Sequence, residues 1–275
     1  MEFDLGGLKQ VPISPQEWHA RFQIQASWTE SIRSFILERV RFQPSSQILE
    51  VGCGTGAILE DVGQKVDYLI NGSASNGLGH SNIHGVDINE TYLKLAQTNL
   101  PLTPLVIGDA VSLPYRDNSF EITFCHFLLM WLNKPNNAVL EMQRVTLPGG
   151  FVIAFAEPDY GGRIDYPPEL EKLGRLQTKA LTLQNADPYI GRKVCSAFSN
   201  AGLTDIQVGV LGGNWKIGDS KFDSDSEWGM VISDLKDQIS ENEINRFKNV
   251  SIQAYEKGMR ILFVPTFYAV GRVVE

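Results

Sequence analysis

The stretch ILEVGCGTGAILE, residues 48–60, decides what kind of fold this chain adopts. A short apolar run contains an acid, Glu50, and is followed by three glycines at alternate positions, Gly52, Gly54 and Gly56. Glycine has no Cβ and adopts positive φ freely, so the backbone can approach a ligand closely at these positions. Because one glycine would suffice for a plain tight turn, we interpret the stretch as a binding loop between a strand and a helix.

Apolar runs and helical patterns alternate on both sides of this loop. The runs expected to form strands are residues 47–51, 83–87, 104–109, 120–127, 151–157 and 204–211, with an alternating closing segment at residues 255–274. Apolar residues recur at helical spacing in residues 15–40, 57–66, 89–100, 136–146, 167–184 and 191–203. This alternation predicts βαβ units and a mostly parallel sheet with helices on both faces.

The composition limits the class of protein. The chain has 275 residues, 43% of them hydrophobic, and the balance is that of an ordinary globular domain. No apolar run reaches the roughly 18 residues of a membrane span, and the first residues do not resemble a secretory signal. Three scattered cysteines, Cys53, Cys125 and Cys195, predict neither a disulfide framework nor a metal site, and they favour the cytoplasm. A formal net charge of -8 disfavours nucleic acid as a partner.

Two classes of ligand fit the glycine loop. The pattern Gly52-x-Gly54-x-x-Ala57 satisfies the loose fingerprint of dinucleotide-binding folds, which keeps an NAD(P)-binding oxidoreductase as an alternative. However, Glu50 stands two residues before the first glycine, where it would repel a pyrophosphate, and the glycines continue to Gly56. A ligand with a cationic end therefore suits the loop better.

Five motifs together resemble the class I S-adenosylmethionine-dependent methyltransferases. They are EVGCGTG (residues 50–56), GVDIN (85–89), GDA (108–110), LPYRDNSFEITFCHFLLMWL (113–132) and LPGG (147–150). The resemblance extends from about Trp18 to the end of the chain, and it is to the branch that includes quinone-methylating and natural-product enzymes. It implies a Rossmann-like, seven-stranded, mostly parallel sheet with helices on both faces and an antiparallel last strand.

The resemblance also implies a cofactor, S-adenosyl-L-methionine, and the residues that bind it. Asp87 should accept hydrogen bonds from both ribose hydroxyls, while Asp109 and the Ala110 amide face the adenine. The glycines should pass beneath the methionine portion, and Glu50 should lie near its cationic amino group. The full expected set is Glu50, Gly52, Cys53, Gly54, Gly56, Asp87, Ile88, Asp109 and Ala110. A helix cap at Asp87 and a turn at Asp109 are the alternatives.

The acceptor side is less specified by sequence. The implied reaction is in-line attack by a small-molecule acceptor on the sulfonium methyl group, and a non-catalytic, cofactor-binding member is a further alternative. His126 is a candidate base or a packing histidine. Asp159 and Tyr160 are further catalytic candidates, because the polar segment at residues 157–167 follows a buried strand. The same segment is equally consistent with a solvated loop that holds an internal Asp–Arg pair.

We expect one domain over residues 1–275, built from a core and added segments. The expected parts are an N-terminal helical cap (1–44), a cofactor-binding core (45–160) and two lid insertions (161–188 and 212–258).

Overall fold

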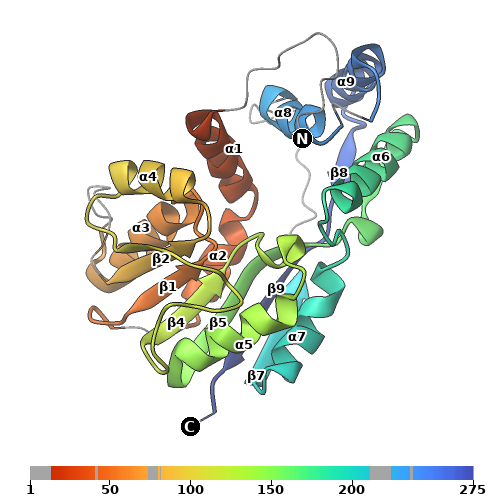
Figure 1. Ribbon diagram of the computed structural model, residues 1–275. Coiled ribbons are helices and arrows are strands. Elements are labelled where there is room, and N and C mark those ends of the chain that lie inside the picture. The colour runs from red at the N-terminus through yellow and green to blue at the C-terminus, as the bar shows by residue number, and fades with distance from the viewer. Residues whose placement is uncertain are drawn as a thin grey trace, which may run out of the picture.

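A computed structural model of the chain gives the fold (Figure 1), and it describes residues 14–40, 43–73, 80, 82–210, 224–235 and 238–274. Parts of the expected organisation lie outside these residues, namely residues 1–13 and 41–42 of the N-terminal cap, 74–79 and 81 of the core, and 212–223 and 236–237 of the second lid insertion.

A seven-stranded sheet forms the centre of the molecule, in the order β3-β2-β1-β4-β5-β9-β7. Its strands are β1 (Ile48–Val51), β2 (Ile83–Asp87), β3 (Leu105–Ile107), β4 (Phe120–Cys125), β5 (Thr146–Pro158), β7 (Thr204–Val210) and β9 (Thr266–Arg272). The pairs among β1 to β5 are parallel, and β9 runs antiparallel to both β5 and β7. The predicted sheet with an antiparallel last strand is therefore confirmed.

Helices cover both faces of the sheet (Figure 1). On one face lie α2 (Glu30–Leu37), α3 (Ala57–Asn71) and α4 (Glu90–Asn99), and on the other lie α5 (Pro135–Val145) and α7 (Val194–Asn200). Each face has its own apolar core, and successive residues of β1, Ile48 and Leu49, belong to different cores. All four residues of β1 are buried, which explains why a central parallel strand reads as an unbroken apolar run.

A third apolar cluster lies apart from the sheet, in a part that we call the helical lobe. The lobe consists of α6 (Glu169–Leu183), α8 (Ser224–Leu235) and α9 (Glu241–Glu256), which pack around the buried side chain of Trp228. A two-stranded sheet, β6 (Ile164–Tyr166) with β8 (Ile261–Phe263), stands at its base. The N-terminal helix α1 (Pro15–Trp28) contacts α3, α4 and α8, so it bridges the main domain and the lobe (Figure 1).

The element boundaries differ from the sequence prediction at four places. The predicted helix at 15–40 is two helices, because the backbone leaves helical geometry at Thr29, whose side chain bonds to His126. The helical pattern at 191–203 is a short 3-10 turn followed by α7. The predicted closing strand is divided into β8 and β9 around Pro265, which has no N–H to donate to a ladder. Finally, β5 begins at Thr146 rather than Phe151, since the Gly149 N–H bonds to the Val273 carbonyl.

Among the described helices, none combines the length and the apolar character that crossing a membrane requires.

Gly85 sits at a crowded point of this architecture. It pairs with Glu50 across β1 and β2, and a Cβ built on it would lie 2.7 Å from the Cys53 sulfur and 2.8 Å from Leu59 and Leu105 side-chain carbons. By contrast, Gly229 on α8 has room, because among the described residues outside its own helix the nearest atom to its Cβ position is Arg21 Nε, at 4.0 Å.

We therefore predict that Gly85→Ala lowers the free energy of unfolding by about 1–3 kcal/mol through overpacking. The matched substitution Gly229→Ala should cost nothing, because it relieves the roughly 0.5–1 kcal/mol penalty of glycine within a helix. Urea unfolding of both variants measures the two values. Equal effects of the two substitutions would show that the contact between β2 and the glycine loop is not tight.

Candidate functional site

The glycine loop lies at the carboxyl edge of the sheet, between β1 and α3. Gly52, Gly54 and Gly56 all have positive φ, at 77°, 51° and 84°, which a residue with a side chain rarely adopts. A Cβ on Gly52 would lie 2.6 Å from a methyl group of Leu128. The strand order reverses between β1 and β4, and open α/β sheets bind ligands at such a point. The loop therefore has the backbone geometry of a binding loop.

The carboxylate of Asp87 is fixed at the end of β2 by two backbone donors. Its Oδ2 accepts the Gly54 N–H at 2.8 Å, and its Oδ1 accepts the Asn89 N–H at 2.8 Å. Asp87 is not the cap of α4, because the Asn89 side chain accepts the Thr91 and Tyr92 N–H groups instead. Each oxygen of Asp87 keeps a further lone pair for a ligand.

Glu50 is buried on β1, with 1% of its surface exposed, and its Oε2 has no hydrogen-bond partner within the described structure. Burial raises the pKa of Glu50 well above its usual value, and the charge of Arg33 lowers it in part. Arg33 is itself 1% exposed and is held by Asp61 (2.5 Å), the Thr29 hydroxyl (2.7 Å) and the Ala26 carbonyl (2.8 Å). The site thus contains one buried acid, and the charge of Arg33 offsets only part of the cost of burying it.

Cys53, which stands between Gly52 and Gly54 in the loop, contributes packing. Its side chain is buried in the apolar core on the α2 and α3 face, and it lies against Gly85. Burial raises the pKa of the Cys53 thiol well above its usual value, and the charges of Glu50 and Asp87 raise it further. The thiol therefore stays protonated.

Helix α1, which belongs to the N-terminal cap expected over residues 1–44, lies directly across the glycine loop. His19 Nδ1 shares a hydrogen bond of 2.9 Å with the Thr55 hydroxyl. The Phe22 ring comes within 3.6 Å of the position that a Cβ would take on Gly54, and Trp18 stacks on Phe22 at 5.6 Å. Helical spacing of aromatic residues was the only signal, and it does not distinguish a core face from a site face.

The loop after β3 carries the residues expected on the adenine side. Asp109 is exposed and accepts the Val111 N–H at 3.0 Å, so it does form a turn, while Ala110 beside it is buried. Ile88, at the end of β2, is 72% exposed. An exposed isoleucine next to Asp87 offers an apolar surface to a flat ring.

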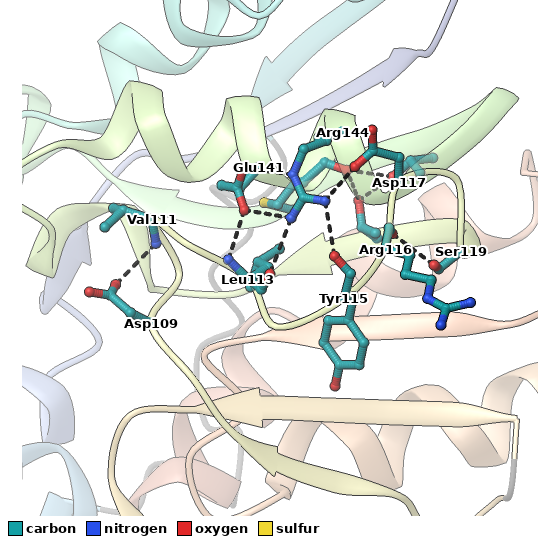
Figure 2. A network of polar contacts seen from close by, with 12 residues as sticks. Asp109, Val111, Leu113, Tyr115, Arg116, Asp117, Ser119, Glu141 and Arg144 are labelled. Atoms are coloured by element: carbon teal, nitrogen blue, oxygen red, sulfur yellow. Dashed lines mark hydrogen bonds and ion pairs between the residues drawn. The ribbon is translucent and has the colours of Figure 1, made fainter.

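Arg144 of α5 anchors this loop (Figure 2). Its guanidinium donates to the carbonyls of Tyr115 (2.9 Å) and Leu113 (3.1 Å), and it pairs with Asp117 (2.7 Å) and Glu141 (2.7 Å). Glu141 also accepts the Leu113 N–H at 2.7 Å. These contacts give Asp117, the acid of the motif at 113–132, a structural reason, since they fix the path of the backbone between Asp109 and β4.

His126 and Asp159, two candidates for the acceptor side, are both engaged by other side chains. His126 is 8% exposed, and its Nε2 shares a hydrogen bond of 2.7 Å with the Thr29 hydroxyl. Burial, with the Arg33 charge, lowers the pKa of His126 well below its usual value, so the ring stays neutral. Asp159 pairs with Arg192 through both oxygens, at 2.5 and 2.7 Å. Burial would raise the pKa of Asp159, but the bonds from Arg192 outweigh it and the pKa lies below its usual value.

Tyr160, the third candidate, lies at the exit of β5, near the lobe. Burial raises the pKa of Tyr160 to about 12, and the charge of Asp234 on α8 adds to this effect. The side chain therefore remains a neutral hydroxyl at physiological pH. A chain of hydrogen bonds holds Asp234, because Gln177 donates to it at 2.7 Å and Arg163 donates to Gln177 at 2.5 Å.

The Asp–Arg pair expected within residues 157–167 is present, and it is buried rather than solvated. Arg163 donates to both oxygens of Asp165, at 2.7 and 2.9 Å. With Tyr160, this pair lines a cavity of about 540 Å³ that also borders the polar side of α6. The segment after β5 therefore forms a wall of a cavity.

Glu157 is a functional position that sequence reasoning underestimated. It is 0% exposed at the end of β5, and it accepts the N–H groups of Leu128 (3.0 Å), Leu129 (3.0 Å) and Met130 (3.3 Å). Glu157 thus caps the turn that follows β4 and fixes Leu128 against Gly52. A glutamate at the end of a buried strand was the available signal, but its donors are 27 to 29 residues away in the chain.

Comparison with known proteins agrees with this geometry. Residues 49–154 match a family model described as a methyltransferase domain. Residues 49–154 therefore form a methyltransferase domain. Demethylmenaquinone methyltransferase of Renibacterium salmoninarum is 31% identical over 135 residues, which are 48% of this chain and 51% of that protein. The chain spans about half the length of the curated relatives it matches.

Solved structures share the fold of this methyltransferase domain. Phosphoethanolamine N-methyltransferase 2 of Haemonchus contortus, in complex with S-adenosyl-L-methionine, has a TM-score of 0.54 at 16% identity, over 96% of this chain and 54% of that one. The cyclase SpnF has a TM-score of 0.52 at 16% identity, over 90% of this chain and 81% of that one. The fold itself therefore occurs with more than one chemistry.

Glu157 should make the stability of the protein depend on pH. Burial raises the pKa of Glu157 from 4.5 to about 7, against the lowering effect of its three N–H donors. Between these values the folded state holds a proton that the unfolded state has released, so the free energy of unfolding falls as the pH rises. Each unit of pKa difference corresponds to about 1.4 kcal/mol, so the unfolding free energy should fall by about 3 kcal/mol over the whole range.

Glu157→Gln keeps an acceptor oxygen but cannot titrate, so it should lack this loss. From pH 5 to pH 8 the native protein should lose unfolding free energy relative to the variant, so the variant becomes the more stable of the two or its deficit shrinks. Urea unfolding at four pH values measures it. A difference that is constant across this range would mean that Glu157 is ionised throughout.

Proposed function

We propose that this protein transfers the methyl group of S-adenosyl-L-methionine to a small-molecule acceptor. One observation carries the proposal, namely that two carboxylates flank a loop of positive-φ glycines. Glu50 has a buried oxygen without a donor, and Asp87 has both oxygens oriented by backbone N–H groups. The cofactor has a cationic amino group for the first and a ribose diol for the second.

The remaining cofactor contacts follow from the residues around the loop. The free lone pairs of Asp87 suit two adjacent hydroxyl donors. Ile88 offers its exposed side chain to the adenine ring, and the anchored loop brings Asp109 and the Ala110 amide to the same side. The family match supports this ligand over the NAD(P) alternative, and the acid before the glycines supports it independently.

The cofactor, when bound, supplies an electrophilic methyl group and a neutral thioether as leaving group. The residues of the chain then have to align the acceptor and exclude water rather than stabilise a large charge. Phe22 and Leu128, which lie against Gly54 and Gly52, are suited to exclude water. We propose positioning roles for His126, which holds Thr29, and for Asp159, which is held by Arg192.

We propose that Tyr160 contributes to acceptor binding and that the helical lobe forms a lid over the acceptor. A cavity of about 540 Å³ is the size of a small-molecule site, and Tyr160 lies on its wall. The first relative named above acts on demethylmenaquinone by its name, which also favours a small molecule. Three free cysteines, two of them buried, are in keeping with the cytoplasmic location that we propose.

A second candidate is a member of the fold that binds the cofactor without transferring its methyl group. The likeness to SpnF, a cyclase, favours keeping this candidate. Binding and turnover must therefore be measured separately.

The proposal predicts that S-adenosylhomocysteine stabilises the protein and that NAD does not. At 100 times its Kd a ligand adds about 2.7 kcal/mol, which corresponds to a rise in Tm of roughly 5–11 °C for a domain of this size. Asp87→Ala should lose at least tenfold in affinity, because it removes charge-assisted bonds. Thermal unfolding and calorimetry provide these values.

Labelled S-adenosyl-L-methionine with a cell metabolite extract then tests transfer, and mass spectrometry identifies the product. A thermal shift with NAD alone would contradict the proposed function. Binding of S-adenosylhomocysteine without any labelled product would support the non-catalytic candidate.

The proposed lid makes a separate prediction about the segments at 161–188 and 212–258. Addition of S-adenosylhomocysteine should slow amide hydrogen exchange in at least one of them, because ligand binding would favour the closed arrangement. Hydrogen exchange with mass spectrometry, with and without the ligand, measures this. Full protection of both segments without ligand would make them permanent core and would require another entrance for the acceptor.

A further inference from the structure

Two side chains of opposite charge, Arg21 of α1 and Asp234 of α8, lie where the main domain meets the helical lobe. Helix α8 contacts both α1 and α6 and lies between them (Figure 1). Arg21 Nε is 4.0 Å from the position that a Cβ would take on Gly229 of α8, and the charge of Arg21 acts on Asp234. No ion pair joins the two within the described structure, so a polar group can stand between them.

Each of the two side chains is held in place and keeps one unused hydrogen-bonding atom. Arg21 Nη1 is a buried donor without a partner in the described structure, and the guanidinium lies over the Trp18 ring, with Cζ 5.1 Å from the centroid. Asp234 Oδ2 accepts the Gln177 amide at 2.7 Å, while Oδ1 accepts no hydrogen bond from the described residues. Since native proteins rarely leave buried polar groups unpaired, a free donor next to a free acceptor points to a ligand.

The pair lies near the edge of the sheet at which a methyl group would be delivered. Phe22, the neighbour of Arg21 in the chain, comes within 3.6 Å of the Cβ position of Gly54 in the glycine loop. The charge of Asp234 acts on Tyr160, which follows β5 and lines the cavity described above. Because β1, β4 and β5 are parallel, the glycine loop and the exit of β5 are at the same edge. The pair is thus close to both.

The surroundings of Asp234 make it a better base than an ordinary aspartate. Burial raises the pKa of Asp234, and this outweighs the lowering by the Gln177 hydrogen bond and by the nearby guanidinium charges. Those charges belong to Arg163 and Arg21. Arg163 is already paired with both oxygens of Asp165, so Arg21 is the one of the two with an open donor. A carboxylate with a raised pKa is better suited to take a proton from an acceptor.

A hydroxyl group is the occupant that uses both free atoms. It can donate its proton to Asp234 and accept a hydrogen bond from Arg21 through its oxygen. A neutral amine could accept from Arg21 only with the lone pair that it needs for attack on the methyl group. A carboxylate would pair with Arg21, but Asp234 would repel it. The pair therefore favours a hydroxyl that is acidic enough to give its proton to a carboxylate.

We propose that the acceptor carries an ionisable hydroxyl group, a phenol or an enol, which binds between Arg21 and Asp234. The inference rests on the proposed function and names the class of its acceptor. As the O–H bond breaks, Asp234 Oδ1 takes the proton and Arg21 Nη1 stabilises the negative oxygen. The electron pair freed on the oxygen, or on a carbon conjugated to it, forms the bond to the methyl group, and the sulfur keeps the electron pair of the bond that breaks. Asp234 later releases the proton to water.

The transfer assay with labelled S-adenosyl-L-methionine and a cell metabolite extract provides the acceptor, and fragmentation of the product locates the methyl group. We expect it on a phenol or enol oxygen or on a carbon conjugated to one. With that acceptor, Asp234→Asn should lower kcat roughly a hundred- to ten-thousandfold, as for a lost general base. Arg21→Met should lower kcat/KM roughly ten- to hundredfold, as for a lost charge-assisted bond. Both variants should bind S-adenosylhomocysteine as tightly as the native protein does.

A pH profile distinguishes a base from a residue that only supports the structure. Asp234→Asn should recover rate as the pH approaches the pKa of the acceptor hydroxyl, because the acceptor then ionises in solution, whereas the native rate should stay level over the same range. Two matched controls, Glu256→Gln and Arg246→Met, remove exposed charges of α9 and should leave activity unchanged. Thermal unfolding of each variant checks that it is folded.

Several outcomes would overturn the inference. They are a methyl group found on nitrogen, sulfur or a carboxylate, an unchanged kcat in Asp234→Asn, and weaker binding of S-adenosylhomocysteine by Arg21→Met. Binding of S-adenosylhomocysteine without any labelled product would also overturn it and would support the non-catalytic candidate. If the native protein does not bind S-adenosylhomocysteine at all, the proposed function itself fails, and this result is distinct from the others.

Discussion

The buried carboxylate of Glu50 is the constraint on which much of this structure depends. An acid at the end of a central strand has to be compensated or left for a ligand. The charge of Arg33 provides part of the compensation, and the hydrogen bonds of Arg33 to Thr29, Ala26 and Asp61 hold the N-terminal region. Thr29, where the helix breaks and where His126 also bonds, is thus tied to the same arginine, and α1 lies across the glycine loop beyond the break. One buried acid thus connects the core of the sheet to the helix that covers the site.

Two buried glutamates at the carboxyl edge of the sheet differ in how many hydrogen-bond donors they have. Glu157 has three backbone donors and organises the turn after β4, whereas Glu50 keeps an oxygen without a donor. Hydrogen bonds to a buried carboxylate satisfy it, and a missing donor leaves the cost of burial for a ligand to relieve. The difference separates a residue that shapes the site from a residue that binds in it. The sulfonium cofactor that we propose is cationic, which suits the unsatisfied one.

The parts of the fold that depend on local spacing could be predicted from the sequence, and those that depend on distant partners could not. Alternating strands and helices predicted the sheet, and the glycine spacing predicted the loop beside Asp87. The break at Thr29 depends on His126, 97 residues away, so helical periodicity alone missed it. The small sheet of β6 and β8 joins segments nearly a hundred residues apart in the same way.

A crystal structure with S-adenosylhomocysteine tests the central claim most directly. The account predicts that the ligand lies along the glycine loop, with its ribose hydroxyls within hydrogen-bonding distance of the two Asp87 oxygens. Its amino group should approach Glu50 Oε2, the acceptor that has no donor within the described structure. A ligand bound away from this loop, or bound there with Asp87 and Glu50 both out of contact, would contradict the account.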